Sequence, residues 1–448
     1  MPQRSMDQEL PGGPPAGGAR GDTTAQAWPW LETVHSSLIA MGAAFMGLAP
    51  RLLPGLLAVI AVVTVVEVLR AGTTGRQVLR DVFSPLPMRV AVALLAFAGL
   101  SSLWASDLYL ALTSVVQIGL LVLSAGALIA LLPGHISRLP PTRKERFTRA
   151  VPIGFLLGLA FLVVEFATGN ALSLAFVNRF PAIVGDSAKD AVRQGDRVVG
   201  FMAFYLDRNV AALMLMLPAT VVATMRWLPR PLALWLAVTG VVVALGVAAV
   251  SASSTAKLAA VLGGLAALAV TRWPQPAIRT IAALLAAGIV LALPLGHVPS
   301  LLGMETAPWL APSARERAMI WDRTATAARR TPIAGTGVQS TRFQEADRTV
   351  KVDGLQGERR QLGWHAHNVV LQTWLELGAI GALLLLALGV TSIRAIAGLA
   401  ADRQPAGMAL VAMVVGVGLT GWGMWQPWLI ASFGMGLCAL WVTQPVKA

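Results

Sequence analysis

The chain has 448 residues, of which 56% are hydrophobic and only 13% are charged, and its formal net charge is +13 at pH 7. A soluble protein carries about twice that charged fraction, so the composition excludes the soluble globular class. One cysteine, Cys438, excludes a disulfide scaffold and a cysteine-based metal site. In a membrane protein, excess positive charge commonly reflects cytoplasmic loops and anionic lipids or ligands. We therefore expect membrane lipids, and no nucleic acid, among the partners.

The chain is expected to begin with a disordered cytoplasmic tail over residues 1–30, because this stretch is polar and rich in glycine and proline and has no cleavable signal pattern. Apolar runs of nearly 20 residues, the length that spans a bilayer, then follow one another. The first two are short and could instead form one re-entrant hairpin. The fold class predicted is all-α and polytopic, with about twelve spans at 33–49, 52–70, 88–104, 108–132, 150–168, 207–225, 231–250, 255–271, 278–296, 367–390, 407–423 and 427–444.

The short loops predict the orientation of these spans. Arginine and lysine concentrate between spans two and three and between spans four and five, and such loops are typically cytoplasmic. Both termini are then cytoplasmic, and two long loops, at about 169–206 and 297–366, face the periplasm. These loops divide the chain into membrane helices one to nine (31–296), a large periplasmic loop (297–366) and membrane helices ten to twelve (367–448).

Both long loops are rich in cations. The first carries Arg197, with Arg208 at the start of the next span, and the second carries Arg315, Arg317 and eight further basic residues. A solvated, partly salt-bridged face would account for them. An anion-binding cavity would also do so, since guanidinium groups match the geometry of phosphate.

The second loop is expected to be partly helical. Ser313 and Glu316 have the spacing of a capping box. Small and aromatic residues then recur at helical spacing, which predicts a stripe that packs against the membrane helices. Thr331 and Pro332 end this helix, and Gly335-Thr-Gly337 is interpreted as a turn, too short for a nucleotide-binding fingerprint. The polar segment 338–364 is expected to cover a cavity.

Polar residues gather where span ten is predicted to begin. His365, His367 and Asn368 lie there, and Glu376 and Gly378 follow within the span. Polar groups at such a position are costly and suggest a function. The simpler interpretation is that Asn368 caps the helix and that the histidines are ordinary interfacial residues.

Taken in order, these pieces resemble the O-antigen ligase/polymerase superfamily, and within it the O-antigen ligase family. They are Arg317-Ala-Met-Ile-Trp321, Pro332-Ile-Ala-Gly335-Thr-Gly337, and His365-Ala-His367-Asn368 with Glu376 and Gly378. Arg197-Val-Val-Gly200 is similar to a further family element. Relatives often carry Ser-Arg at the start of span eight, where this chain reads Ser253-Ser-Thr-Ala-Lys257, so Lys257 is the candidate for the missing cation.

The resemblance implies a glycosyltransferase-C-like fold in the bacterial inner membrane, with the active site facing the periplasm. It implies transfer of polysaccharide from an undecaprenyl-diphosphate donor to the lipid A core, with no cofactor and no metal. The leaving diphosphate is already a good anion, so it requires cations and no general acid. The acceptor hydroxyl requires a base, and an imidazole with a pKa near 6.5 suits that role.

Roles are assigned on this basis. His367 is the expected base, and His365, two residues away, should project to another side of the helix. Arg197 and Arg317 are expected to hold the diphosphate. The further substrate-binding candidates are Arg315, Arg208, His365, Asn368 and Lys257. Asp207 and Glu165 are expected to pair with arginines, Glu376 to orient its helix, and Trp425 and Trp428 to anchor the membrane interface.

Three alternatives remain open. An O-antigen polymerase or a protein O-oligosaccharyltransferase would share the donor and differ in the acceptor. A secondary transporter would fit twelve spans, although no repeat between the halves is evident. A lipid-binding or structural membrane component would explain the cations but not the paired histidines.

Overall fold

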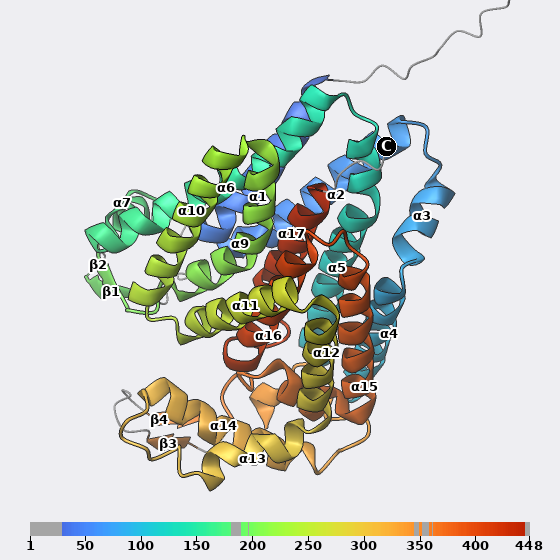
Figure 1. Cartoon of the computed structure of the whole chain (residues 1–448). Helices are drawn as coiled ribbons and strands as arrows, with labels where there is room; N and C mark the ends of the chain where they lie inside the picture. Colours follow the sequence, from blue (N-terminus) through green and yellow to red (C-terminus); the bar gives the residue numbers. More distant parts are fainter. Residues whose placement is uncertain are drawn as a thin grey trace, which may run out of the picture.

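Figure 1 shows the fold of the chain as a computed structural model. The structure describes residues 29–180, 190–195, 197–344, 349–351, 358–360 and 362–443. Residues 1–28 of the tail predicted for residues 1–30 therefore lie outside the described residues.

The membrane domain consists of helices that coincide with the predicted apolar runs. They are α1 (Pro29–Leu48), α2 (Leu53–Arg70), α4 (Leu86–Ser101), α5 (Leu108–Ser137), α6 (Pro141–Thr168), α9 (Asp207–Trp227), α10 (Arg230–Val250), α11 (Ser254–Arg272), α12 (Pro274–Val290), α13 (Ala292–Leu301), α15 (Val369–Ala397), α16 (Gln404–Thr420) and α17 (Pro427–Val442). Each predicted span falls on one of them, so the prediction of a polytopic α-helical membrane protein is confirmed.

The number of full spans differs from the twelve expected. Within the described residues, nine helices are long and apolar enough to cross a membrane. The pair α12–α13, bent by 77°, makes ten if it counts as one span. The last two helices, α16 and α17, have only 17 and 16 residues, fewer than the roughly 20 that a bilayer requires.

Helix α9 forms the centre of the bundle (Figure 1). It packs against α1, α6, α10, α11, α16 and α17. Every residue from Val210 to Thr220 is buried, as expected for a helix that is apolar on all sides. The start of α9 lies beside the end of α1, because Asn209 Nδ2 donates to Gly47 O at 2.8 Å and to Leu48 O at 2.9 Å.

Helix α15 is interrupted at Gly378, and a loop from elsewhere in the chain fills the break. Gly378 has φ +60° and ψ −158°, a combination open essentially to glycine alone. The loop 332–337 supplies the missing backbone partners: Gly337 N donates to Glu376 O at 2.8 Å, and Ala379 N donates to Pro332 O at 2.8 Å. The predicted turn Gly335-Thr-Gly337 therefore belongs to a loop that is hydrogen-bonded to α15 at its break, and this contact between loop 332–337 and Gly378 is called the joint below.

Substitution of Gly378 by alanine should destabilise this joint. The new Cβ would lie 2.3 Å from Ile333 O, and the backbone strain and overpacking together should cost about 3 kcal/mol or more. Thermal unfolding in detergent would measure the loss as a lower midpoint. Gly264→Ala is the control, because nothing lies within 4 Å of that added Cβ. Equal midpoints for the two variants would contradict the role of the joint.

The segments between the membrane helices are more varied than an all-α prediction implied. The first long loop contains α7 (Ala171–Arg179) and the antiparallel strands β1 (Ala191–Gln194) and β2 (Arg197–Phe201). The second contains α14 (Pro312–Ala328), the 3-10 helix η4 (Ser340–Phe343), and strands β3 (Thr349–Lys351) and β4 (Glu358–Arg360). The remaining short helices among the described residues are η1 (Pro50–Leu52), η2 (Ser102–Trp104) and α3 (Gly75–Phe83).

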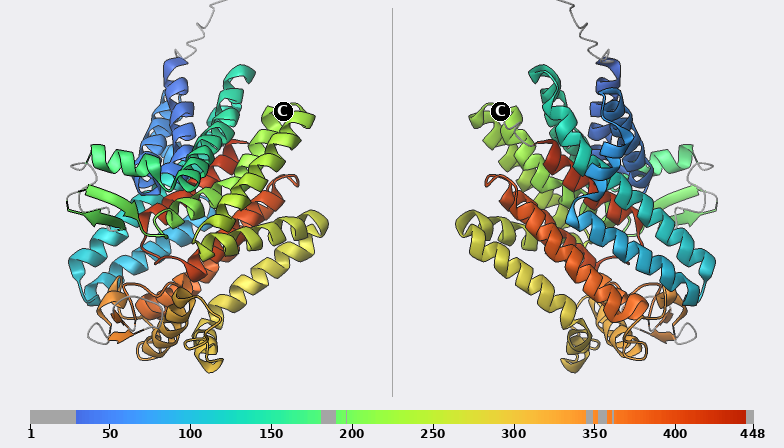
Figure 2. Two further views of the ribbon diagram at one scale, coloured as in Figure 1. Left: turned by 90° about the vertical axis from the view of Figure 1, so that its left-hand side faces the viewer. Right: turned by 90° about the vertical axis from the view of Figure 1, so that its right-hand side faces the viewer.

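Helix α14 packs against the membrane helices as its apolar stripe predicted. Ala318, Ala325 and Ala328 are buried, and His297 on α13 lies 2.7 Å from Asp322 on α14. The predicted capping box is wrong: α14 starts at Pro312 with Ala311 as N-cap and without a side-chain cap, so Ser313 lies inside the first turn. Helices α13 and α14 and strands β3 and β4 gather at one end of the molecule (Figures 1 and 2).

Candidate active site

The two histidines lie in an irregular loop just before α15. The helix begins at Val369, two residues later than predicted, and runs on to Ala397. Asn368 is its N-cap and accepts hydrogen bonds from Val370 N and Leu371 N, both at 3.0 Å. The capping role of Asn368 is therefore confirmed, and both imidazoles precede the helix.

The rings of His365 and His367 lie together, contrary to the expectation that they would diverge. Their centroids are 4.1 Å apart. That expectation assumed helical geometry, whereas His367 has φ +50° and turns the chain back on itself. A left-handed conformation is uncommon for a residue with a side chain, and such strain is often found at functional sites.

Hydrogen bonds determine which nitrogen of each ring carries a proton. His367 Nδ1 lies 2.6 Å from Gly421 O, and because a carbonyl can only accept, Nδ1 is the protonated nitrogen. His367 N donates to His365 Nδ1 at 3.3 Å, so the proton of His365 is on its Nε2. In the neutral rings, His367 Nε2 therefore offers a lone pair and His365 Nε2 an N–H donor.

Both imidazoles are uncharged near neutral pH. Burial lowers the pKa of His367 to about 3, with further contributions from His365 and Arg317, against a hydrogen bond to Gly421 that raises it. Burial likewise lowers the pKa of His365 to about 4, together with the charges of Arg342 and Arg317. The value near 6.5 expected from sequence is thus too high, because the rings lie in a partly closed site beside cations.

Arg317 is the predicted cation that the structure brings to the histidines. Burial lowers its pKa, and the charges of Glu316 and Asp207 oppose that shift. Its ordinary pKa is so high that it stays charged. Lys257, at the start of α11, is exposed and lies within electrostatic range of Asp207. Arg315 projects about 200° away from Arg317 around α14, so it is a poor substitute for it.

Arg342 is a member of this cluster that the sequence did not single out. It lies in η4, donates to Gln339 Oε1 at 2.7 Å, and approaches the Trp364 ring at 5.9 Å. Its charge acts on His365. In the sequence it was one of ten basic residues of the loop, with nothing to distinguish it. Gly421 was missed as well, since its contribution is a backbone carbonyl.

Arg208 and Arg197 lie outside this cluster. Arg208 lies 5.5 Å from the Trp428 ring and is influenced by Arg51 and Asp190. Arg197 is exposed at the start of β2, and among the described residues no hydrogen bond or ion pair links it to the histidines. In both views of Figure 2 the hairpin of β1 and β2 lies apart from α13 and α14.

Glu376 is the centre of a buried network below the histidines. Its carboxylate accepts from Gln339 N at 2.9 Å, Thr341 Oγ1 at 2.6 Å and Gln372 Nε2 at 2.9 Å, and also from Trp425 Nε1. The predicted orienting role agrees with these contacts. The network fixes η4, and so Arg342, relative to α15.

Three other sequence interpretations are corrected by these contacts. Glu165 pairs with no arginine among the described residues and instead accepts from Ser173 N at 3.0 Å. Asp207 has electrostatic neighbours but no ion pair within 4.0 Å among the described residues. Trp425 and Trp428 are buried, so they are core residues and not interfacial anchors.

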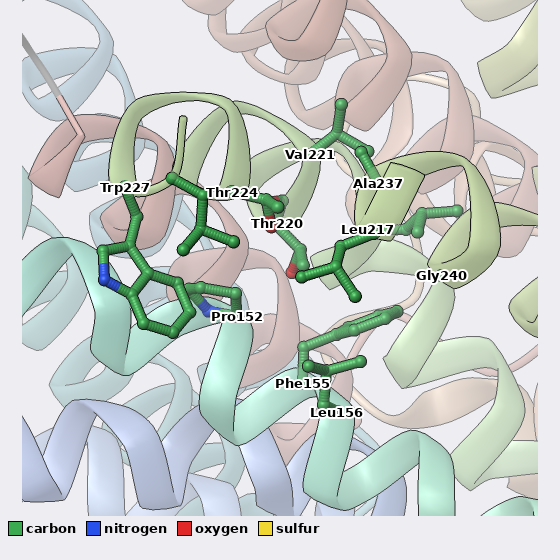
Figure 3. A pocket seen from close by; sticks show the side chains of 12 residues that line it. Pro152, Phe155, Leu156, Leu217, Thr220, Val221, Thr224, Trp227, Ala237 and Gly240 are labelled. Carbon is green, nitrogen blue, oxygen red and sulfur yellow. The ribbon is translucent and has the colours of Figure 1, made fainter. Parts of the chain in front are cut away.

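A small crevice between α6, α9 and α10 lies away from these groups (Figure 3). It has a volume of about 20 Å³, enough for a single water molecule, and its walls are mostly apolar. The hydroxyls of Thr220 and Thr224 donate to carbonyls of their own helix. None of the predicted site residues lines it, so we do not assign it a part in the reaction.

Comparison with known proteins identifies one segment of the chain. Residues 239–386 match the family described as O-antigen ligase, and this segment includes Lys257, Arg317 and both histidines of the loop. A protein of Rickettsia conorii, provisionally described as a polysaccharide ligase, is 33% identical over 123 residues, 27% of this chain and 30% of the relative. A similarly described protein of Rickettsia bellii is 31% identical over equal shares. The matched region is thus less than a third of each relative's length, and it confirms the family resemblance.

Proposed function

We propose that this chain is a membrane glycosyltransferase that acts as an O-antigen ligase, because residues 239–386 match the family described as O-antigen ligase. The proposed donor is a glycan on undecaprenyl diphosphate, and the acceptor is a hydroxyl of the lipid A core oligosaccharide. Transfer would take place at the periplasmic face of the bacterial inner membrane. His367 is the proposed general base, and Arg317 holds the diphosphate with help from Arg342 and Lys257.

The proposed step is a displacement at the anomeric carbon of the donor. The acceptor oxygen attacks that carbon while its proton passes to His367 Nε2. The bond from the anomeric carbon to the diphosphate oxygen breaks, and the electron pair leaves with undecaprenyl diphosphate. The developing negative charge is stabilised by Arg317, whose guanidinium keeps its positive charge. The N–H of His365 Nε2 is available to orient a substrate oxygen.

One observation carries this proposal: a neutral histidine within electrostatic range of a partly buried arginine. Gly421 O holds Nδ1–H at 2.6 Å, which leaves the Nε2 lone pair for proton abstraction, and Arg317 is close enough to lower the pKa of the same ring. A base and an anion-binding group therefore lie within electrostatic range of each other, which suits transfer from a lipid diphosphate to a hydroxyl.

Purified protein supplied with a lipid-linked donor tests the function. Glycan should appear on lipid A core, and should not appear on a pilin-type protein or on a second lipid-linked glycan. Turnover should persist in EDTA, as the family resemblance implies. Transfer to the pilin or to a second glycan in place of lipid A core would identify a protein oligosaccharyltransferase or a polymerase. Absence of transfer to every acceptor would reject the proposal.

The pH dependence should follow the lowered pKa of His367. Because that pKa is about 3, the ring of the free protein is neutral throughout the range from pH 5 to 8. Such a ring is a weak base, and the negative charge of a bound diphosphate would raise its pKa toward the value that proton transfer requires. A histidine with a pKa near 6.5 would lose about 30-fold of its neutral form between pH 8 and 5. The pH dependence of kcat/KM reports ionisations of the free protein. We therefore expect the titration of His367 to change kcat/KM by less than about threefold between pH 5 and 8. A rise centred near pH 6.5 would contradict the assignment.

A further inference from the structure

A polar groove lies between the beginnings of α1 and α6, far from the histidines. These ends of the two helices lie opposite α13 and α14 in the molecule (Figures 1 and 2). The groove has a volume of about 320 Å³ and is lined by residues of these two helices only: Thr33, Ser36, Ser37, Ala40, Arg146, Arg149, Ala150 and Ile153. It is thus a site of its own, separate from the proposed active site.

The charge in the groove is entirely positive. Arg146 and Arg149 line it, and no acidic side chain does so. The acid nearest on α1, Glu32, is buried and bound by Arg143 at 2.9 Å. The groove arginines therefore present a site for an anion, and three hydroxyl-bearing residues on α1 add hydrogen-bonding capacity.

The groove changes from polar to apolar along its length. Helices α1 and α6 start at the same end of the molecule and run side by side, since Arg146 donates to Thr33 Oγ1 at 3.2 Å and Gly154 contacts Ala40 further along. The arginines and hydroxyls thus lie near the helix starts, and Ala40 and Ile153 lie deeper in the spans. At Gly154 the backbones touch, because an added Cβ would lie 2.0 Å from Ala40 O.

We propose that this groove binds the head group of an anionic phospholipid, with an acyl chain lying over Ala40 and Ile153. A phosphate linked to an apolar tail has the same order of polar and apolar parts as the groove. A soluble anion has no apolar part that could contact Ala40 and Ile153. A nucleic acid or an acidic protein would require a broader basic surface than two helix turns provide.

Lipid retention by the full-length protein tests the site. Detergent-purified protein would be mixed with vesicles of phosphatidylethanolamine and phosphatidylglycerol, re-isolated, and examined by native mass spectrometry. The protein should retain phosphatidylglycerol selectively. Arg146→Gln with Arg149→Gln should weaken retention about 30-fold, from roughly 1 kcal/mol for each arginine near a lipid surface. Ser37→Leu, which fills the groove and keeps both charges, should also weaken retention.

The matched control removes two arginines elsewhere. Arg76 and Arg80 on α3 are exposed and belong to loops predicted to lie on the same side of the membrane, so Arg76→Gln with Arg80→Gln removes equal charge without touching the groove. This variant should retain lipid normally. Equal loss in both double variants, or loss in neither, would overturn the proposal. Displacement of the lipid by inorganic phosphate alone would show a simple anion site, and would also overturn it.

Discussion

His367→Ala should lower the rate of glycan transfer by about 100-fold or more, the usual contribution of a general base, while binding of the lipid-linked donor stays within about threefold. The reason is that proton transfer and donor binding are assigned to different residues. In the proposed mechanism His367 Nε2 carries the lone pair that accepts the acceptor proton, because Nδ1–H is held by Gly421 O. The proposed mechanism assigns the diphosphate to cations, which this substitution leaves in place. Turnover and donor affinity, measured side by side, separate these effects.

Two further variants show whether the loss is chemical. His365→Ala should be milder and should act partly through substrate binding, since its Nε2–H is a donor and not a base. Asn368→Ala removes the helix cap and should cost about 1 kcal/mol of stability with little change in turnover. Equal inactivity of Asn368→Ala and His367→Ala would show that the whole loop before α15, and not the imidazole alone, determines turnover. Normal turnover of His367→Ala, or inactivity of His365→Ala alone, would contradict the assignment of the base.

Arg317→Ala should reduce kcat/KM for the lipid-linked donor by roughly 30- to 1000-fold, because loss of a charge-assisted contact to phosphate costs on the order of 2–4 kcal/mol. Lysine should restore little of the activity, since it cannot reproduce the planar fork of the guanidinium. Removal of this charge should also raise the pKa of His367, which Arg317 now lowers. Donor-dependent kinetics at several pH values would measure both effects.

Arg197→Ala is the sharpest control for this prediction. The sequence suggested that Arg197 and Arg317 share the task, whereas Arg197 is exposed on β2 and Arg317 lies near the histidines. We therefore expect Arg197→Ala to retain most of the activity. Arg315→Ala should also be mild, because its side chain leaves α14 on another side. An equal, severe loss of activity in the Arg197 and Arg317 variants would favour the prediction from sequence that both residues hold the diphosphate. Normal turnover of both variants would show that these arginines belong to a solvated face without a role in binding.

The sequence by itself determined the helical membrane domain, the presence of a helix between Ser313 and Thr331, and the helix cap at Asn368. These features depend on local properties: apolar run length, 3.6-residue periodicity, and a side chain that bonds to backbone groups two and three residues away. Each of them lies within one stretch of chain, so each could be predicted without knowing what packs against it. The exact number of full spans was not predicted: α12 and α13 are bent by 77° at a break, and α16 and α17 have only 17 and 16 residues.

Only the tertiary structure decided how the site is assembled. The partner of His367 is a carbonyl 54 residues further along the chain, and a backbone oxygen carries no sequence signal. The close approach of the His365 and His367 rings depends on one left-handed residue. The break in α15 at Gly378 is satisfied by loop 332–337. Arginines that look equivalent in sequence differ because packing brings Arg317 beside the imidazoles and leaves Arg197 exposed. Such contacts join segments distant in the chain, and the pKa values of the histidines follow from them.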